Sequence, residues 1–260
     1  MNLRQTLENA RTAGKSAFIP FVMAGDPDLE TSADIILKLQ EAGADLLELG
    51  IPFSDPVADG VTVQKAADRA LQSGATLQGV LDMLQNLRAK GLTIPVCLFS
   101  YLNPIYHMGY DHFVTAAKKA GAQGALIVDL PPEEAEDYLA IAKAADFETV
   151  FLCSPTTSAA RLAVIDAASS GFVYYVSREG VTGAQTDLPA SLAGKLQNLQ
   201  SMLKNPVAVG FGISTPAHVV ALRGKVDGIV VGSALVKIVE EKGKIAANAV
   251  AEMTRSLLAG

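Results

Sequence analysis

The sequence predicts an α/β protein whose parallel strands close into a barrel, and three observations support this fold. Short apolar runs alternate with amphipathic segments along the whole chain, and eight such runs can be distinguished. Most of them are continuously apolar, as expected of parallel strands that are covered on both faces. The length of 260 residues agrees with the roughly 250 that one eight-stranded α/β barrel needs. No linker or low-complexity segment interrupts the pattern, so residues 1–260 are expected to form one domain, a single (β/α)8 TIM barrel.

The apolar pattern also gives the expected order of elements. An extra helix at 2–13, with Leu3 and Leu7 four residues apart, comes first and is expected to plug the floor of the barrel. Strands are expected at 17–23, 45–50, 95–100, 124–129, 148–153, 172–176, 207–211 and 228–231. Helical spacing of apolar residues predicts helices near 30–42, 63–90, 111–120, 133–145, 157–169, 189–203, 215–222 and 235–258. The long stretches after the second and eighth strands are expected to hold additional helices.

Two of the expected loops are longer than a barrel requires. The second and third strand runs begin at 45 and 95, whereas one strand–helix unit averages about thirty residues in a barrel of this size. The excess holds the segment PFSDPVADG at 52–60. The interval between strands six and seven is also long and holds SREGVTGAQTDLP at 177–189. Loops that follow strands lie on the catalytic face of such barrels, so both segments are predicted to be lids.

Composition excludes several kinds of partner. The chain has 21 Lys and Arg against 27 Asp and Glu, a net charge of −6, and no basic block. This balance argues against nucleic acid and anionic membranes. The amino terminus has no apolar signal core, and no apolar run reaches the about 18 residues of a membrane span, so a soluble, cytoplasmic protein is expected. Cys97 and Cys153 lie in strand runs and are expected to be buried free thiols.

Glu48 is the first candidate for catalysis. Between the ends of the strand runs it is the one ionisable residue apart from the terminal Asp129, and no Lys or Arg lies in any run. If the face that it shares with Leu46 points inward, its carboxyl group is buried without a basic partner from the strands. Burial then raises its pKa, as proton transfer near neutral pH requires. The alternative is a structural carboxyl group that pairs with the hydroxyl of Tyr174 or Tyr175.

Two further acids lie on the loop after the second strand. Asp59 precedes Gly60 and Asp55 precedes Pro56, and both are positions where Asp commonly forms turns. The place of Asp59 on an enlarged loop after a strand makes it the second catalytic candidate, whereas Asp55 is expected to serve a turn or a contact.

Small residues follow the last three strands and suggest a phosphate site. Barrels often hold phosphate with backbone amides of the last loops and with the amino end of a short helix. The residues concerned are Gly180 and Gly183, Gly210 and Gly212, and Gly232 with Ser233. The alternative is that these glycines form tight turns only.

Other chemistries find little support in the sequence. His107, His112 and His218 lie outside the strands and do not cluster at ligand spacing, so no metal site is expected. No Lys lies at a strand end facing the barrel, which argues against a Schiff-base aldolase. No nucleophile elbow, P-loop or dinucleotide fingerprint occurs. The residues alone thus predict a phosphate-binding barrel that uses carboxyl groups for acid–base chemistry, and they do not name the substrate.

At these residues the chain resembles the tryptophan synthase alpha subunits over nearly its whole length. The segment LELGIPFSDPVADG at 47–60 is the most specific part of this resemblance. The other matching segments are FVMAGDPD at 21–28, YLNPI at 101–105, VDLPPEE at 128–134, SREGVTG at 177–183, VGFGIS at 209–214 and VGSALVK at 231–237. Two departures are visible, namely Val61 where the family often has proline and Met23 where many members have threonine. Val61 is expected to loosen the lid after Asp59.

The resemblance implies cleavage of indole-3-glycerol phosphate to indole and glyceraldehyde 3-phosphate. Asp59 would face the indole N–H, and Glu48 would move a proton between indole C3 and the side-chain hydroxyl. The resemblance also implies apolar walls for indole and a set of groups that close over the substrate and bind its phosphate. The implied walls are Phe21, Leu98, Tyr101, Leu126 and Tyr174, and the implied lid and phosphate groups are Thr182, Gly183, Phe211, Gly212, Gly232 and Ser233.

The family further implies a partner. A beta subunit that carries pyridoxal phosphate would consume the indole in an alpha2beta2 complex, and this chain would hold no cofactor itself. The implied contact residues are Pro52, Phe53, Asp55, Asn103 and Pro104. Three alternatives remain open at this point: a stand-alone indole-3-glycerol phosphate lyase, an activating partner with little chemistry of its own, and another phosphate-binding barrel such as a sugar-phosphate isomerase.

Overall fold

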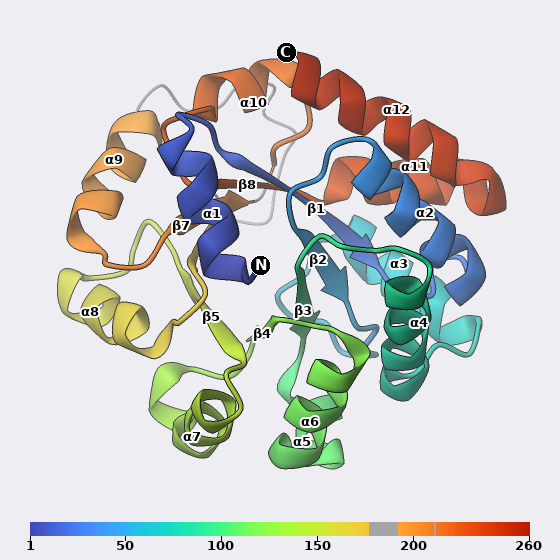
Figure 1. Ribbon diagram of the computed structural model, residues 1–260, viewed down its shortest axis with the longest axis horizontal. Coiled ribbons are helices and arrows are strands. Elements are labelled where there is room, and N and C mark those ends of the chain that lie inside the picture. The colour runs from blue at the N-terminus through green and yellow to red at the C-terminus, as the bar shows by residue number, and fades with distance from the viewer. Residues whose placement is uncertain (177–191, 211) are drawn as a thin grey trace.

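The computed structural model describes residues 1–176, 192–210 and 212–260. Within these ranges eight parallel strands form a closed barrel in sequence order, and helices surround it (Figure 1). The predicted (β/α)8 TIM barrel is therefore confirmed. The strands are β1 (Ala17–Met23), β2 (Leu47–Gly50), β3 (Val96–Ser100), β4 (Gly124–Ile127), β5 (Glu148–Cys153), β6 (Val173–Val176), β7 (Val207–Gly210) and β8 (Gly228–Val231).

The helices follow the predicted ranges, and the additional helices after β2 and β8 are present. The predicted range 63–90 is two helices separated near Gly74, and the range 235–258 is two helices separated near Gly243. In chain order the helices are α1 (Leu3–Thr12), α2 (Leu29–Glu41), α3 (Val61–Gln72), α4 (Leu77–Ala89), α5 (Leu102–Met108), α6 (Tyr110–Ala120), α7 (Glu136–Ala144), α8 (Ala159–Ala168), α9 (Leu192–Met202), α10 (Pro216–Leu222), α11 (Ser233–Lys242) and α12 (Ala246–Ala259), with short 3₁₀ turns η1 (Pro132–Glu134) and η2 (Gly243–Ile245).

The short helix α5 was not predicted. Its sequence contains Asn103-Pro104, a pair that is typical of turns. Pro104 lies in the first turn of α5, where a helix has no intrahelical use for its N–H, so the helix tolerates it. The fully buried Ile105 fixes α5 to the protein core.

Side chains alternate along the strands between two apolar clusters. The outer cluster lies between the strands and the helices and includes Val22, Leu47, Leu49 and Leu98. The interior cluster includes Phe21, Met23, Leu46, Phe99 and Leu126. The alternation therefore decides which residues of each strand can reach a substrate inside the barrel.

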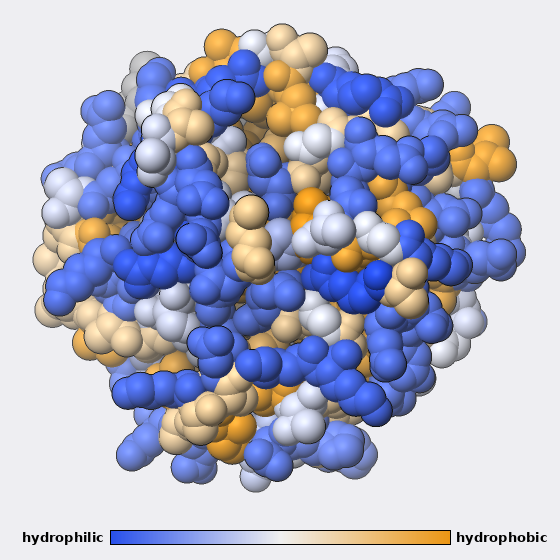
Figure 2. Space-filling view, viewed as in Figure 1, coloured by the Kyte–Doolittle hydropathy of each residue, from blue (hydrophilic) through white to orange (hydrophobic). Residues whose placement is uncertain are grey.

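Helix α1 closes one end of the barrel, as predicted. Figure 1 shows α1 across the opening that faces the viewer, and Leu3 and Leu7 belong to the interior cluster. The carboxylate of Glu148, at the start of β5, accepts hydrogen bonds from the backbone N–H groups of Leu3 (2.6 Å) and Arg4 (3.1 Å). A negative charge at the first N–H groups of a helix stabilises it. Mainly hydrophilic side chains cover this end of the molecule (Figure 2), and the site lies at the other end.

Candidate active site

Glu48 points into the barrel. It lies in β2 between Phe21 of β1 and Cys97 of β3 in the strand register, and it is 1% exposed. Among the described residues its Oε1 atom has no hydrogen-bond partner. Burial raises the pKa of Glu48 to about 8, and repulsion from the Asp59 carboxylate adds to this shift. The expected inward position of the Glu48 carboxyl group is thus confirmed.

The structure excludes one of the two tyrosines that could have paired with Glu48. Tyr175 belongs to the outer cluster and faces the helices. Tyr174 belongs to the interior cluster, and burial together with the charges of Glu48 and Asp59 raises its pKa. Tyr174 therefore lies near both acids and keeps its phenolic proton at neutral pH.

Asp59 is the second buried acid of the site. It lies on the loop after β2 and is 8% exposed. The N–H of Ala58 donates to Tyr101 Oη at 3.0 Å, and the Tyr101 hydroxyl forms a hydrogen bond with the Asp59 carboxylate. Burial raises the pKa of Asp59 to about 6, and the bond from Tyr101 opposes this shift. Tyr101 thus holds the loop and its acid together.

The two acids differ in protonation at neutral pH. With a pKa of about 8 Glu48 is mostly protonated, and with a pKa of about 6 Asp59 is mostly ionised. A pair of carboxyl groups whose environments separate their pKa values can supply one proton donor and one acceptor. The interior of this barrel is therefore equipped for acid–base chemistry.

Aromatic and aliphatic side chains form the walls around Glu48. Phe21 and Phe99 pack edge to face with their ring centroids 5.3 Å apart, and Leu126 and Tyr174 belong to the same interior cluster. The prediction that Leu98 lines the interior is wrong, because Leu98 belongs to the outer cluster. Side chains alternate along β3, so Phe99 takes the inward position that was assigned to Leu98.

Of the residues predicted to bind phosphate, those that the structure describes lie at the carboxyl ends of β7 and β8. A Cβ atom at Gly210 would collide with the hydroxyl of Tyr174, so only glycine fits there. Gly212 has a left-handed backbone (φ 81°). Helix α11 begins at Ser233, directly after Gly232, which has no side-chain cap bond. The first N–H groups of a helix are free to bind an anion. Thr182, Gly183, Gly180 and Phe211 lie outside the described residues, as does the whole of the second predicted lid at 177–189.

Comparison with known proteins shows the family to which the chain belongs. Residues 7–258 match the family described as "Tryptophan synthase alpha chain". The chain belongs to this family. The tryptophan synthase alpha chain of Pelobacter propionicus is 46% identical over 222 residues, which cover 85% of this chain and 83% of that one. The alpha subunit structure from Legionella pneumophila has a TM-score of 0.89 at 37% identity, covering 99% of this chain and 97% of that one. A tryptophan synthase complex from Pyrococcus furiosus contains a chain with a TM-score of 0.87 at 40% identity, covering 95% of this chain and 99% of that one.

Membership of the tryptophan synthase alpha chain family supports the role of an alpha subunit in tryptophan biosynthesis. In the described ranges no group of three or more His, Cys, Asp or Glu side chains comes together as a metal site would require. None of the described helices is both long and apolar enough to cross a bilayer. Cys97 and Cys153 are buried and free, as predicted.

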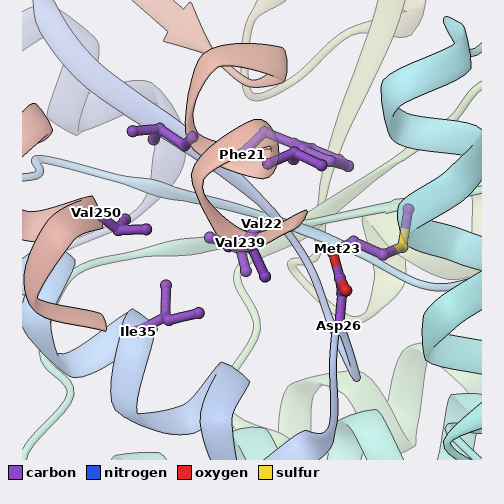
Figure 3. Close-up of a pocket in the computed structure, with 9 residues that line it drawn as sticks. Phe21, Val22, Met23, Asp26, Ile35, Val239 and Val250 are labelled. Atoms are coloured by element: carbon purple, nitrogen blue, oxygen red, sulfur yellow. The ribbon is translucent and has the colours of Figure 1, made fainter. Parts of the chain in front are cut away.

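A small pocket adjoins this site, since Phe21 lines both. It lies between β1 and the helices α2, α11 and α12, where Ile35, Val239 and Val250 face Val22 (Figure 3). Its volume of about 10 Å³ holds no more than a water-sized molecule. It is therefore not the substrate site of an alpha chain.

The residues expected to contact a partner follow the neighbouring strands β2 and β3, at the carboxyl end of the barrel. Asp55 and Asn103 are exposed, and Phe53 and Pro104 are partly exposed. Phe53 also packs on Tyr101, with ring centroids 5.4 Å apart. Pro52 is buried in this chain, so it supports the loop from beneath and offers no surface to a partner.

The two departures from the family pattern have different surroundings. Met23 is buried in the interior cluster, next to Gly50 in the register of β1 and β2. Val61 is the first residue of α3 and is 66% exposed. The family's usual proline at this position would suit a first helical residue, whose φ proline fixes and whose N–H the helix does not use.

Replacing Val61 with proline should stabilise the protein. Gly60 before it has an extended backbone (φ −74°, ψ 160°), which is the conformation that proline imposes on its predecessor. We expect the free energy of unfolding to rise by about 0.4–1 kcal/mol, because the unfolded chain loses freedom. Urea unfolding of the variant and the unchanged protein measures this, and a lower midpoint for Val61→Pro would contradict the described start of α3.

Proposed function

We propose that this chain cleaves indole-3-glycerol phosphate to indole and glyceraldehyde 3-phosphate. The observation that carries the proposal is the pair of buried acids, Glu48 with a pKa of about 8 and Asp59 with a pKa of about 6, inside an aromatic-walled barrel. The reaction needs one proton donor and one anion at neutral pH, and this pair provides both.

The proposed mechanism uses each acid at a stated atom. Ionised Asp59 accepts a hydrogen bond from the indole N–H and stabilises the positive charge that develops on the ring. Protonated Glu48 donates its proton to indole C3. The resulting Glu48 carboxylate then takes the proton of the side-chain hydroxyl on the carbon attached to C3. That carbon becomes an aldehyde as its bond to C3 breaks. The electron pair of the broken bond returns to the ring and restores indole. Glu48 ends protonated, as it began.

The proposed phosphate site comprises the backbone at Gly212 and at the start of α11. Gly212 has a positive φ, and Gly232 leads directly into the helix. The helix dipole favours an anion there, so a chain with net charge −6 can hold a phosphate without a cluster of basic side chains. Thr182, Gly183 and Phe211, which lie outside the described residues, would complete the closure over the substrate.

Replacing Gly212 with aspartate should weaken substrate binding severely. The new carboxylate would repel the phosphate, and about 4 kcal/mol of repulsion at 4 Å near a protein surface corresponds to a KM raised by at least about 100-fold. Gly212→Ala is the matched control, since it introduces the same backbone strain at φ 81° without the charge. An aspartate variant that binds substrate as well as the alanine variant would remove Gly212 from the phosphate site.

We propose further that a beta subunit binds at the carboxyl end of the barrel, in an alpha2beta2 complex in the cytoplasm. Phe53, Asp55, Asn103 and Pro104 lie there, and Val57 on the same loop is 82% exposed. A similar chain from Pyrococcus furiosus comes from a structure described as a tryptophan synthase complex. Pyridoxal phosphate would be held by the beta subunit, and this chain would bring no cofactor of its own.

Release of free indole tests the proposed reaction. The purified chain is incubated with indole-3-glycerol phosphate, alone and with a beta subunit, and indole is measured by a colour reaction. Indole release that rises when the partner is added supports the proposal. Full turnover without the partner would favour a stand-alone lyase, and no release under either condition would contradict the reaction.

A further inference from the structure

We propose that Arg69 is a positioning residue for Asp59, because it joins α3, the helix that follows the Asp59 loop, to β1 and to α11. This inference rests on the proposed function, in which Asp59 holds the indole N–H. It adds a residue of α3 that was not among the predicted site residues.

The bond between Arg69 and Asp26 is the strongest part of this arrangement. The guanidinium Nε and Nη2 atoms each donate to one oxygen of the Asp26 carboxylate at 2.8 Å. The side chain of Asp26 is 2% exposed and that of Arg69 is 28% exposed. A bidentate pair of this kind fixes orientation as well as distance. Asp26 lies in the turn after β1, three residues beyond its last residue Met23, and it lines the small pocket in Figure 3.

The same guanidinium group also reaches α11. Arg69 Nη1 lies 3.6 Å from Glu240 Oε1, and Lys65 Nζ lies 3.7 Å from the same oxygen. Both cations belong to α3, and Glu240 belongs to α11, the helix whose first residue is Ser233. The helix that carries the acid loop and the helix that begins at the phosphate end are thus joined by one cluster of charges.

Apolar packing alone does not fix the position of α3 along β1. The buried face of α3 consists of Ala66, Ala67 and Ala70, which lie in the interior cluster with Met23. Alanine side chains have no rotamers and present a smooth face. The polar contacts of Arg69, together with the bond from Ser73 Oγ to the carbonyl of Gly25 (3.0 Å), therefore set the position of α3 along β1.

A shift of α3 would reach Asp59 directly. The Gly60 carbonyl accepts from the N–H groups of Val63 (2.9 Å) and Gln64 (3.0 Å) in the first turn of α3. The Gln64 side chain donates to the Asp59 carbonyl at 2.8 Å. The backbone of Asp59 thus moves with the helix, and a misplacement of 1 Å can cost about 100-fold in rate.

Four variants test the proposal. Arg69→Met removes the charge and keeps much of the stem. The double variant Asp26→Asn with Arg69→Met also removes the buried carboxylate that would be left unpaired, so it is expected to fold even if the single variant does not. Glu240→Gln removes the contact to α11. Glu241→Gln is its matched control, because Glu241 is the next residue of α11 and its ion pair, with Lys237 (3.9 Å), stays within that helix.

Two readouts are measured on the full chain: kcat and KM for indole release, and amide hydrogen exchange of residues 51–64. We expect kcat of Arg69→Met and of the double variant to fall by about 10- to 100-fold, while KM stays within about twofold. Exchange in 51–64 should be faster than in the unchanged protein. Glu240→Gln should show both effects more weakly, and Glu241→Gln neither.

Several outcomes would overturn the proposal. Unchanged exchange of 51–64 in the double variant would show that Arg69 does not hold the loop. Faster exchange with an unchanged kcat, or a loss of thermal stability with both readouts unchanged, would reduce Arg69 to a structural role. If the unchanged protein releases no indole, the proposed reaction fails, and the exchange measurement still decides whether Arg69 places the Asp59 loop.

Discussion

Replacing Glu48 with glutamine is expected to lower kcat for indole release by about 10²- to 10⁴-fold, the usual share of a general acid–base group. Glutamine has nearly the same shape as glutamic acid but cannot give a proton to C3 or accept one from the hydroxyl. KM should change little, because the phosphate end of the site is left intact. Steady-state kinetics with indole detection measure both constants, and near-normal turnover would show that Glu48 is not the proton carrier.

The same substitution should also change how stability depends on pH. Glu48 has a pKa of about 8 in the folded protein against an ordinary value of 4.5. The unfolded chain therefore loses its proton first, and folding stability falls as the pH rises from about 4.5 towards 8. Glu48→Gln removes this loss, so its advantage over the unchanged protein should grow across that range. Urea unfolding at several pH values tests this, and Glu41→Gln, the same substitution at an exposed position of α2, is the matched control.

Replacing Asp59 with asparagine is expected to cause the second large loss of kcat. The neutral amide no longer stabilises positive charge at the indole nitrogen, and kcat should fall by about 10²- to 10³-fold, as when one electrostatic group of a preorganised site is lost. The carboxylate also repels Glu48, so the pKa of Glu48 should fall in this variant. A matched control is Asp82→Asn, since Asp82 is exposed on α4.

The dependence of kcat/KM on pH separates the two acids. In the unchanged protein the rate should rise with pH as Asp59 ionises near pH 6, and it should fall as Glu48 loses its proton near pH 8. Residual activity of Asp59→Asn should lack the rise near pH 6 and should begin its fall at a lower pH. An unchanged profile would contradict the assigned protonation states.

The strands and their order were predictable because apolar runs and chain length carry that information. The inward face of β3 was not, since Val96, Cys97, Leu98 and Phe99 are all apolar and no alternation marks the side that faces the interior. Only the pairing of β3 with β2, where Cys97 lies beside Glu48, places Phe99 inside. In β2, by contrast, the single charged residue Glu48 identified the inward face in the sequence.

Contacts between segments that are far apart in the chain could not be predicted from the sequence either. Arg69 and Asp26 are 43 residues apart, and each has an ordinary place of its own, one in a helix and the other at a turn before proline. The family resemblance implied Tyr101 as part of the indole wall, but it did not show that the Tyr101 hydroxyl also holds the Asp59 loop. Pattern and spacing locate acids on strands and loops, but hydrogen bonds across the barrel require coordinates.

The plug formed by α1 has a consequence for the chemistry at the far end. Leu3 and Leu7 fill the barrel at the end opposite the acids, and Glu148 anchors the helix that carries them. This plug excludes water from that end of the barrel, and desolvation is what keeps Glu48 protonated at neutral pH. The first dozen residues thus help to keep Glu48 buried, and we expect a shortened chain that still folds to admit water to this acid and to lower its pKa.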